Sequence, residues 1–214
     1  MARILIVGWF LLSLSVLAQA QIENILLNNS FEDESDLLNN GTLWERYVNA
    51  SSKATFEFDE DPANVIDEAR SIRIEIDQFS GTNWHIGLTQ DRFSLAAGER
   101  YTLTFWAKAE KPRVISIELK RSPGEGPWEG ITEKDFTIQQ DWAEYVHNFI
   151  CKKDYDRTAF FAFWMAQDDP TVWIDFVSLY KGDYANIQPS GYVSRAVEAA
   201  DKLPVAWAQI KRGL

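Results

Sequence analysis

Apolar residues recur at every second position along most of the chain. Residues 71–76, SIRIEI, alternate isoleucine with polar side chains, and residues 114–121, VISIELKR, repeat this pattern. Successive side chains of a β-strand point to opposite faces, so a period of two indicates strands with one buried face. Residues 101–109 and 171–180 are of the same type. Residues 159–166, AFFAFWMA, are apolar on both faces, which is typical of a strand that is covered on both sides.

Turn signals separate these runs. Gly, Pro, Asn, Asp and Ser gather at residues 80–83, 97–99, 122–127 and 168–170. Many short strands with no helical stretch between them predict an antiparallel sandwich, and a jelly roll is the best match. The predicted fold class is therefore all-β, an antiparallel β-sandwich of the jelly-roll type over residues 21–182.

Both ends of the chain differ from this pattern. Residues 1–20 have one positive charge, an apolar run and a final AQA, which predict a cleaved signal peptide, with an uncleaved anchor as the alternative. Residues 183–214 are predicted to form a linker and a short helical tail, because residues 192–202 have apolar side chains at helical spacing. Trp207 and Ile210 make this tail a candidate for contact with a partner or surface. We expect a secreted protein, extracellular or periplasmic, with no membrane insertion after cleavage.

Acidic side chains outnumber basic ones. The sequence has 21 Lys and Arg against 32 Asp and Glu, and loss of Arg3 with the signal peptide leaves 20 against 32. This excess argues against binding to nucleic acid, whose phosphates need clustered Lys and Arg. The acidic residues 58–68 are interpreted as a solvated loop. Cys151 is the single cysteine, so no intramolecular disulfide forms, and a large core, with or without metal, must stabilise the exported chain.

Five segments occur in an order that resembles a known family. They are residues 23–33 (ENILLNNSFED), 71–76, 84–109, 141–149 (DWAEYVHNF) and 172–179 (VWIDFVSL). Together they resemble the carbohydrate-binding modules of families 4 and 9, over roughly residues 23–181. The resemblance implies a jelly-roll sandwich that binds polysaccharide and contains one structural calcium ion. Such modules are usually attached to glycoside hydrolases.

The resemblance also implies where the calcium ion binds, namely where the first and last strands meet. The implied ligands are Glu32 and Asp175 through carboxylates, and Ser30 and the loop around Lys53 through carbonyls. Calcium prefers hard oxygen ligands of these kinds. Phe176 stands where the family usually has a second acid, but neighbours on a strand point in opposite directions, so Asp175 alone need face the ion. The alternative is that Glu32 and Asp175 only accept hydrogen bonds.

Tryptophan supplies the flat apolar surfaces to which the C–H faces of sugar rings bind. Loss of Trp9 with the signal peptide leaves eight of the nine tryptophans. Trp106 points away from Tyr101, Leu103 and Phe105, so we expect it to line a cleft on the outer face of its sheet. The predicted sugar-binding residues are Trp44, Trp84, Trp106 and Trp128, with Gln90, Glu118, Arg121 and Gln167 as polar partners. The other strand tryptophans are expected in the core or beneath the sheet, namely Trp142, Trp164 and Trp173.

Three classes of function remain open. A glycosidase needs two carboxylates about 5–10 Å apart, and only Glu118 and Asp175 lie in aromatic-rich strands. Two histidines and no zinc or nucleophile motif leave little other chemistry, so no catalytic residue is predicted. The sequence favours a non-catalytic protein that binds polysaccharide of the β-glucan or xylan type. The alternatives are a glycoside hydrolase or its accessory protein, and a cell-surface assembly protein with no sugar affinity.

Overall fold

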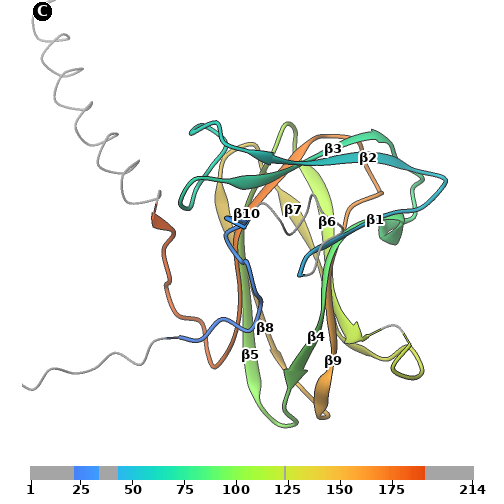
Figure 1. The fold of residues 1–214 in the computed structure, drawn as a ribbon, viewed down its shortest axis with the longest axis vertical. Coiled ribbons are helices and arrows are strands. Elements are labelled where there is room, and N and C mark those ends of the chain that lie inside the picture. Colours follow the sequence, from blue (N-terminus) through green and yellow to red (C-terminus); the bar gives the residue numbers. More distant parts are fainter. Residues whose placement is uncertain (1–21, 34–42, 123, 191–214) are drawn as a thin grey trace, which may run out of the picture.

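Two five-stranded sheets pack face to face in the computed structural model (Figure 1). The structure describes residues 22–33, 43–122 and 124–190. The strands of the first sheet, in spatial order, are β1 (Glu45–Val48), β4 (Ile86–Leu95), β9 (Tyr155–Trp164), β6 (Arg113–Arg121) and β7 (Gly130–Ile138). Those of the second sheet are β2 (Lys53–Asp59), β3 (Ser71–Gln78), β10 (Val172–Lys181), β5 (Arg100–Ala109) and β8 (Ala143–Ile150).

Every pair of neighbouring strands is antiparallel, and the chain passes repeatedly from one sheet to the other. The predicted antiparallel β-sandwich is therefore confirmed. A short 3₁₀ helix, η1 (Asn83–His85), precedes β4. Within the described ranges no helix is long and apolar enough to span a membrane. The predicted signal peptide (1–20) and helical tail (192–202, with Trp207 and Ile210) lie outside the described residues.

The core between the sheets comes from the alternating positions. Tyr101, Leu103 and Phe105 of β5 all belong to the main buried cluster, as their spacing predicts. In β9 the apolar residues divide between two faces. Phe161 and Phe163 enter the main core, whereas Phe160, Ala162 and Trp164 form a separate cluster on the outer face of the first sheet.

Trp44 lies inside the core, so its predicted contact with sugar is wrong. Its side chain is 0 % exposed and packs between Phe31, at a centroid distance of 5.4 Å, and Phe161, at 6.1 Å. Its indole Nε1 donates to the carbonyls of Leu27 and Asn28 at 3.1 and 3.0 Å. A buried tryptophan whose N–H group has backbone partners anchors the N-terminal segment to the core.

Asn24 attaches the N-terminal segment to the last strand. Its Nδ2 donates to the carbonyl of Val177 at 2.9 Å, and its Oδ1 accepts from the backbone N–H of Leu179 at 2.9 Å. Ile25 continues the pairing, because its N–H donates to the carbonyl of Leu179 at 2.7 Å. The side-chain amide therefore reproduces the donor and acceptor of a peptide group in a strand ladder.

The segment from Gly182 to Ser190 runs along the outside of the second sheet (Figure 1, orange to red). Thr102 on β5 donates to the carbonyl of Gly182 at 2.7 Å, and the N–H of Ala185 donates to the Tyr180 hydroxyl at 2.9 Å. At its far end the segment meets the β2–β3 loop, where its last residue bonds to Asp67 at 2.7 Å.

This covering explains why Trp106 is not a cleft residue. Trp106 does point away from the main core, as its position in β5 predicts, but it is only 5 % exposed. The β2–β3 loop covers the same face, because Asp175, the partner of Trp106 on β10, accepts from the N–H groups of Ile66 and Asp67. Residues 65–67 of this loop are buried. The cleft predicted beside Trp106 is therefore wrong. The interpretation of residues 58–68 as a solvated loop is correct for the exposed residues 60–63 and 68, and wrong for the buried residues 65–67.

We predict that Asn24→Ala lowers the free energy of unfolding by about 1–3 kcal/mol, because two peptide groups of β10 lose their partner. Chemical denaturation would measure the change. The matched control is Asn29→Ala. Asn29 accepts from the N–H of Val177 through its backbone carbonyl, and this hydrogen bond remains when the side chain is shortened. Equal stability of the two variants would contradict this role of Asn24.

Candidate functional site

The outer face of the first sheet carries two adjoining hollows of about 540 and 530 Å³. Trp84, Lys120 and Trp164 line both of them, so together they form one trough. The aromatic half of the trough is lined by Tyr47, Trp84, Trp128, Phe160 and Trp164. The polar half is lined by Asn83, Ser116, Glu118, Glu133, Asp135 and Gln167.

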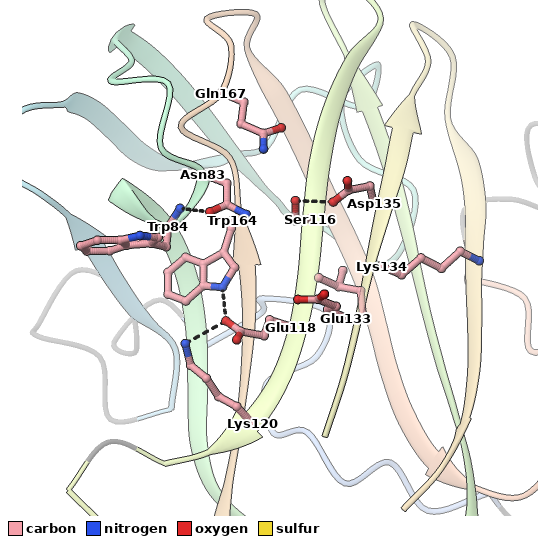
Figure 2. Close-up of a pocket in the computed structure, with 11 residues that line it drawn as sticks. Asn83, Trp84, Ser116, Glu118, Lys120, Glu133, Lys134, Asp135, Trp164 and Gln167 are labelled. Atoms are coloured by element: carbon pink, nitrogen blue, oxygen red, sulfur yellow. Dashed lines mark hydrogen bonds and ion pairs between the residues drawn. The ribbon is translucent and has the colours of Figure 1, made fainter. Parts of the chain in front are cut away.

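Trp164 forms the floor of the trough at the end of β9. It pairs with Gly87 of β4, and a Cβ atom at Gly87 would lie 2.2 and 2.5 Å from two atoms of the Trp164 ring. The missing side chain of Gly87 therefore lets the indole lie against the backbone of β4. The ring edge is fixed as well, because its Nε1 donates to Glu118 Oε2 at 2.7 Å (Figure 2).

Three exposed aromatic residues stand around this floor. Trp84, at 46 % exposure, lies on η1, and its backbone N–H donates to the Asn83 side chain at 2.7 Å. Tyr47 on β1 lies between the two indoles, 6.2 Å from Trp84 and 6.3 Å from Trp164. Trp128 comes from the β6–β7 connection and is 69 % exposed. Such a group of rings presents flat apolar surface beside open solvent.

Lys120 lies in the middle of the aromatic half. Its ammonium is 4.5 Å from the ring centroid of Trp128, 5.2 Å from that of Phe160 and 5.1 Å from that of Trp164. It also forms an ion pair of 2.8 Å with Glu118. These distances are within the range of cation–π attraction.

Carboxylates dominate the polar half. Glu118 on β6 lies directly opposite Glu133 on β7, and Ser116 donates to Asp135 at 2.5 Å. Lys134 also lines this half, but its ammonium donates to a backbone carbonyl of β8 and its side chain points away from the trough (Figure 2). Ionised carboxylates only accept hydrogen bonds, so the polar half favours ligand groups that donate them.

Four of the eight predicted sugar-binding residues line the trough, namely Trp84, Glu118, Trp128 and Gln167. Gln90 does not, because it is 4 % exposed and its amide bonds to both the N–H and the carbonyl of Leu27. Its place is on the inner side of β4, where it holds the N-terminal segment.

Arg121 binds the β6–β7 connection, in which Trp128 lies. It follows Lys120 on β6 and so points to the other side of the strand, where its guanidinium pairs with Glu129 at 2.9 Å. Glu129 also pairs with Lys153, whose ammonium and hydrogen bond lower the pKa of Glu129. The predicted role of Arg121 as a direct sugar partner is therefore replaced by a bracing role behind Trp128.

The sequence does not single out Tyr47, Lys120 or Phe160, and it assigns Trp164 to the core or beneath the sheet. The period of two in β9 does contain a usable signal, because Phe160 and Trp164 share a face opposite to Phe161 and Phe163. Gly87 is another signal, since a glycine inside a strand indicates a close approach of another group, and Gly87 lies inside β4.

The predicted calcium ligands are only partly brought together. Glu32 Oε1 accepts from the N–H groups of Ala69 and Arg70, at 3.0 and 2.9 Å. Asp175 accepts from those of Ile66 and Asp67 at 2.9 and 3.0 Å, so both carboxylates bind the β2–β3 loop. Among the described residues, no three Asp, Glu, His or Cys side chains by themselves form a metal site.

Lys53 cannot complete this group. It begins β2, whereas Glu32 contacts the residues next to the far end of that strand. A seven-residue strand rises about 3.3 Å per residue, so its two ends lie roughly 20 Å apart. The prediction that the loop around Lys53 supplies a calcium ligand is therefore wrong.

Carboxyl groups whose charged form is disfavoured nevertheless gather around the β2–β3 loop. Burial raises the pKa of Asp175 to about 8, although three backbone N–H groups oppose the rise. Burial and the charges of Asp67 and Glu32 raise the pKa of Glu68. Ser30 donates to Asp67 at 2.8 Å. A cation close to these groups would relieve the repulsion, but the calcium ion itself stays a prediction.

Comparison with known proteins agrees with this architecture. No curated protein matches the chain. The chain superposes on a structure described as "CBM4 structure and function" with a TM-score of 0.60 and 22 % identity, over 73 % of this chain and 99 % of that one. It superposes on "BiXyn10A CBM1 APO" with a TM-score of 0.51 and 15 % identity, over 65 % and 89 %.

The sandwich also occurs within larger proteins. The enzymatically active domain of tailspike protein 4 from bacteriophage CBA120 matches with a TM-score of 0.50 and 14 % identity, over 74 % of this chain but 21 % of that one. At these identities the structural likeness establishes the fold. The sequence model of the family CBM_4_9, Carbohydrate binding domain, matches residues 23–171, which is most of the described sandwich. The chain belongs to the CBM_4_9 family of carbohydrate-binding domains.

Proposed function

We propose that this chain is an exported, non-catalytic protein that binds a polysaccharide of the β-glucan or xylan type in the trough of the first sheet. The observation that supports this most strongly is the arrangement of the trough. Exposed rings stand in one half, and carboxylates and amides line the other half. The C–H face of a pyranose ring is its apolar part and packs on aromatic rings, while its hydroxyls need polar partners.

The hydrogen bonds of Glu118 favour sugar binding over hydrolysis. A glycosidase needs a carboxylic acid that is free to protonate the leaving oxygen. Glu118 Oε2 instead accepts from both Lys120 and Trp164, so this carboxylate holds the floor of the trough in place. We expect no release of reducing sugar from xylan, β-glucan, laminarin or soluble cellulose, and such release would replace the binding proposal by an enzymatic one.

We predict that Trp84→Ala and Trp128→Ala each weaken binding at least about tenfold, or roughly 1.4 kcal/mol, because each removes an exposed stacking surface. Affinity gels cast with the four polysaccharides would measure the change. Both side chains are exposed, so the melting temperature should stay close to that of the wild type.

Tyr184→Ala is the matched control for these two variants. Tyr184 is also exposed, at 42 %, but lies with the segment that covers the second sheet. We expect this variant to migrate like the wild type. A wild-type protein that none of the four polysaccharides retards would contradict the proposed function and favour an assembly role.

We further predict that Gly87→Ala weakens binding by about tenfold or more, since the added methyl group collides with the Trp164 ring and tilts it away from β4. Gly130→Ala is the control, because a Cβ atom there meets no atom within 4 Å. Affinity gels and tryptophan fluorescence would follow binding and ring position. Unchanged affinity of Gly87→Ala would show that sugar does not use the Trp164 surface.

The proposal includes a structural calcium ion close to the β2–β3 loop. Glu32 and Asp175 would supply carboxylate oxygens and Ser30 a carbonyl. A cation there would stabilise the charged form of Asp175 and Glu68, whose pKa values are raised in its absence, and this supports the proposal. The ion would strengthen the attachment of the N-terminal segment and β10 to this loop.

At a hundred times its dissociation constant calcium would add about 2.7 kcal/mol of stability. For a chain of this size that raises the melting temperature by roughly 5–10 °C. We predict that a chelator reverses this rise and that Glu32→Gln abolishes it, whereas Glu57→Gln on the exposed side of β2 does not. Identical melting with calcium and with chelator would mean that peptide N–H groups alone satisfy these carboxylates.

A further inference from the structure

We propose that Lys120 is a specificity-determining residue of the trough, whose ammonium donates a hydrogen bond to a ring or hydroxyl oxygen of the bound sugar. This inference rests on the proposed function of the trough. Lys120 is one of the three residues shared by both hollows, so a glycan that crosses from the aromatic to the polar half passes over it. Without a ligand, the ammonium of Lys120 forms an ion pair with Glu118 on the same strand.

The hydrogen bonds of Lys120 leave donors for a ligand. An ammonium has three N–H donors. Among the described residues its only hydrogen-bond acceptor is Glu118 Oε2, at 2.8 Å, and its other near neighbours are the ring faces of Trp128, Phe160 and Trp164. The side chain is only 12 % exposed, so water reaches little of it. A ligand oxygen would satisfy donors that the protein directs at aromatic faces.

The surroundings of Lys120 also prepare it for binding. Three rings and one carboxylate fix the ammonium, so little side-chain entropy is lost when a ligand arrives. A methionine at this position would fill the same apolar space without the cost of burying a charge. If the side chain at this position only filled the space between Trp128 and Trp164, an ammonium group would therefore be unnecessary. The geometry points to a residue that selects for oxygen acceptors and against ligand ammonium groups at this point.

Lys120→Met tests the inference, because it keeps the length of the side chain and removes both donors and charge. With the polysaccharide that retards the wild type most, we expect Lys120→Met to bind about tenfold more weakly, the loss of one charge-assisted hydrogen bond. Lys120→Arg should recover much of this loss, since a guanidinium keeps N–H donors and stacks on aromatic rings.

The matched control is Lys134→Met. Lys134 lies on the neighbouring strand β7, but its ammonium donates to the carbonyl of Val146 and sits over Phe136 instead of entering the trough (Figure 2). We expect its affinity to equal that of the wild type. Melting temperatures of all variants report whether the sandwich is intact.

A double-mutant cycle separates contact with sugar from support of Trp128. If Lys120 contacts the sugar, Lys120→Met weakens binding further in a Trp128→Ala background, by a similar factor. If Lys120 only holds Trp128, the second substitution has no effect, and the inference is overturned. Equal affinity of wild type and Lys120→Met overturns it as well. Failure of the wild type to bind any of the four polysaccharides would instead refute the proposed function itself.

Discussion

The backbone N–H groups of residues 66–70 are the point on which the rest of the structure depends. They bind Asp175 from the last strand and Glu32 from the N-terminal segment, so three distant parts of the chain meet at one loop. Ser190 joins the same loop through Asp67. These contacts place the loop and the segment 182–190 over the second sheet. The outer face of the first sheet is then the surface that holds the trough.

On that open face a few local contacts prepare the trough before any ligand arrives. Gly87 gives Trp164 room to lie on the sheet, and Glu118 fixes both the indole edge and the ammonium of Lys120. Because Glu118 has these two partners, its carboxylate orders the floor of the trough. A rigid arrangement of this kind lowers the entropy lost on binding.

The predicted binding residues that line the trough include one with a clear local signal. Trp128 lies in a connection rich in glycine and proline, where a tryptophan has no core to enter. Trp106 illustrates the opposite case. Its alternation with Phe105 gives the correct side of β5. The residues that bond to its strand partners Asp175 and Glu144 lie about 40 residues before it, in the β2–β3 loop, and some 80 residues after it, at Tyr184. No periodicity within a strand can report a cover of this kind.

The sequence by itself determined the β-sandwich and the inward face of most strands, because a period of two follows from the geometry of each strand alone. It also determined the family, through segments kept in order along the chain. Only the tertiary structure decided which outer face stays open and holds the trough, because that depends on which face distant segments cover. It also decided the pairing of Gly87 with Trp164 and the position of Lys120 among three rings, since strand register and side-chain contacts join residues that are not neighbours in sequence.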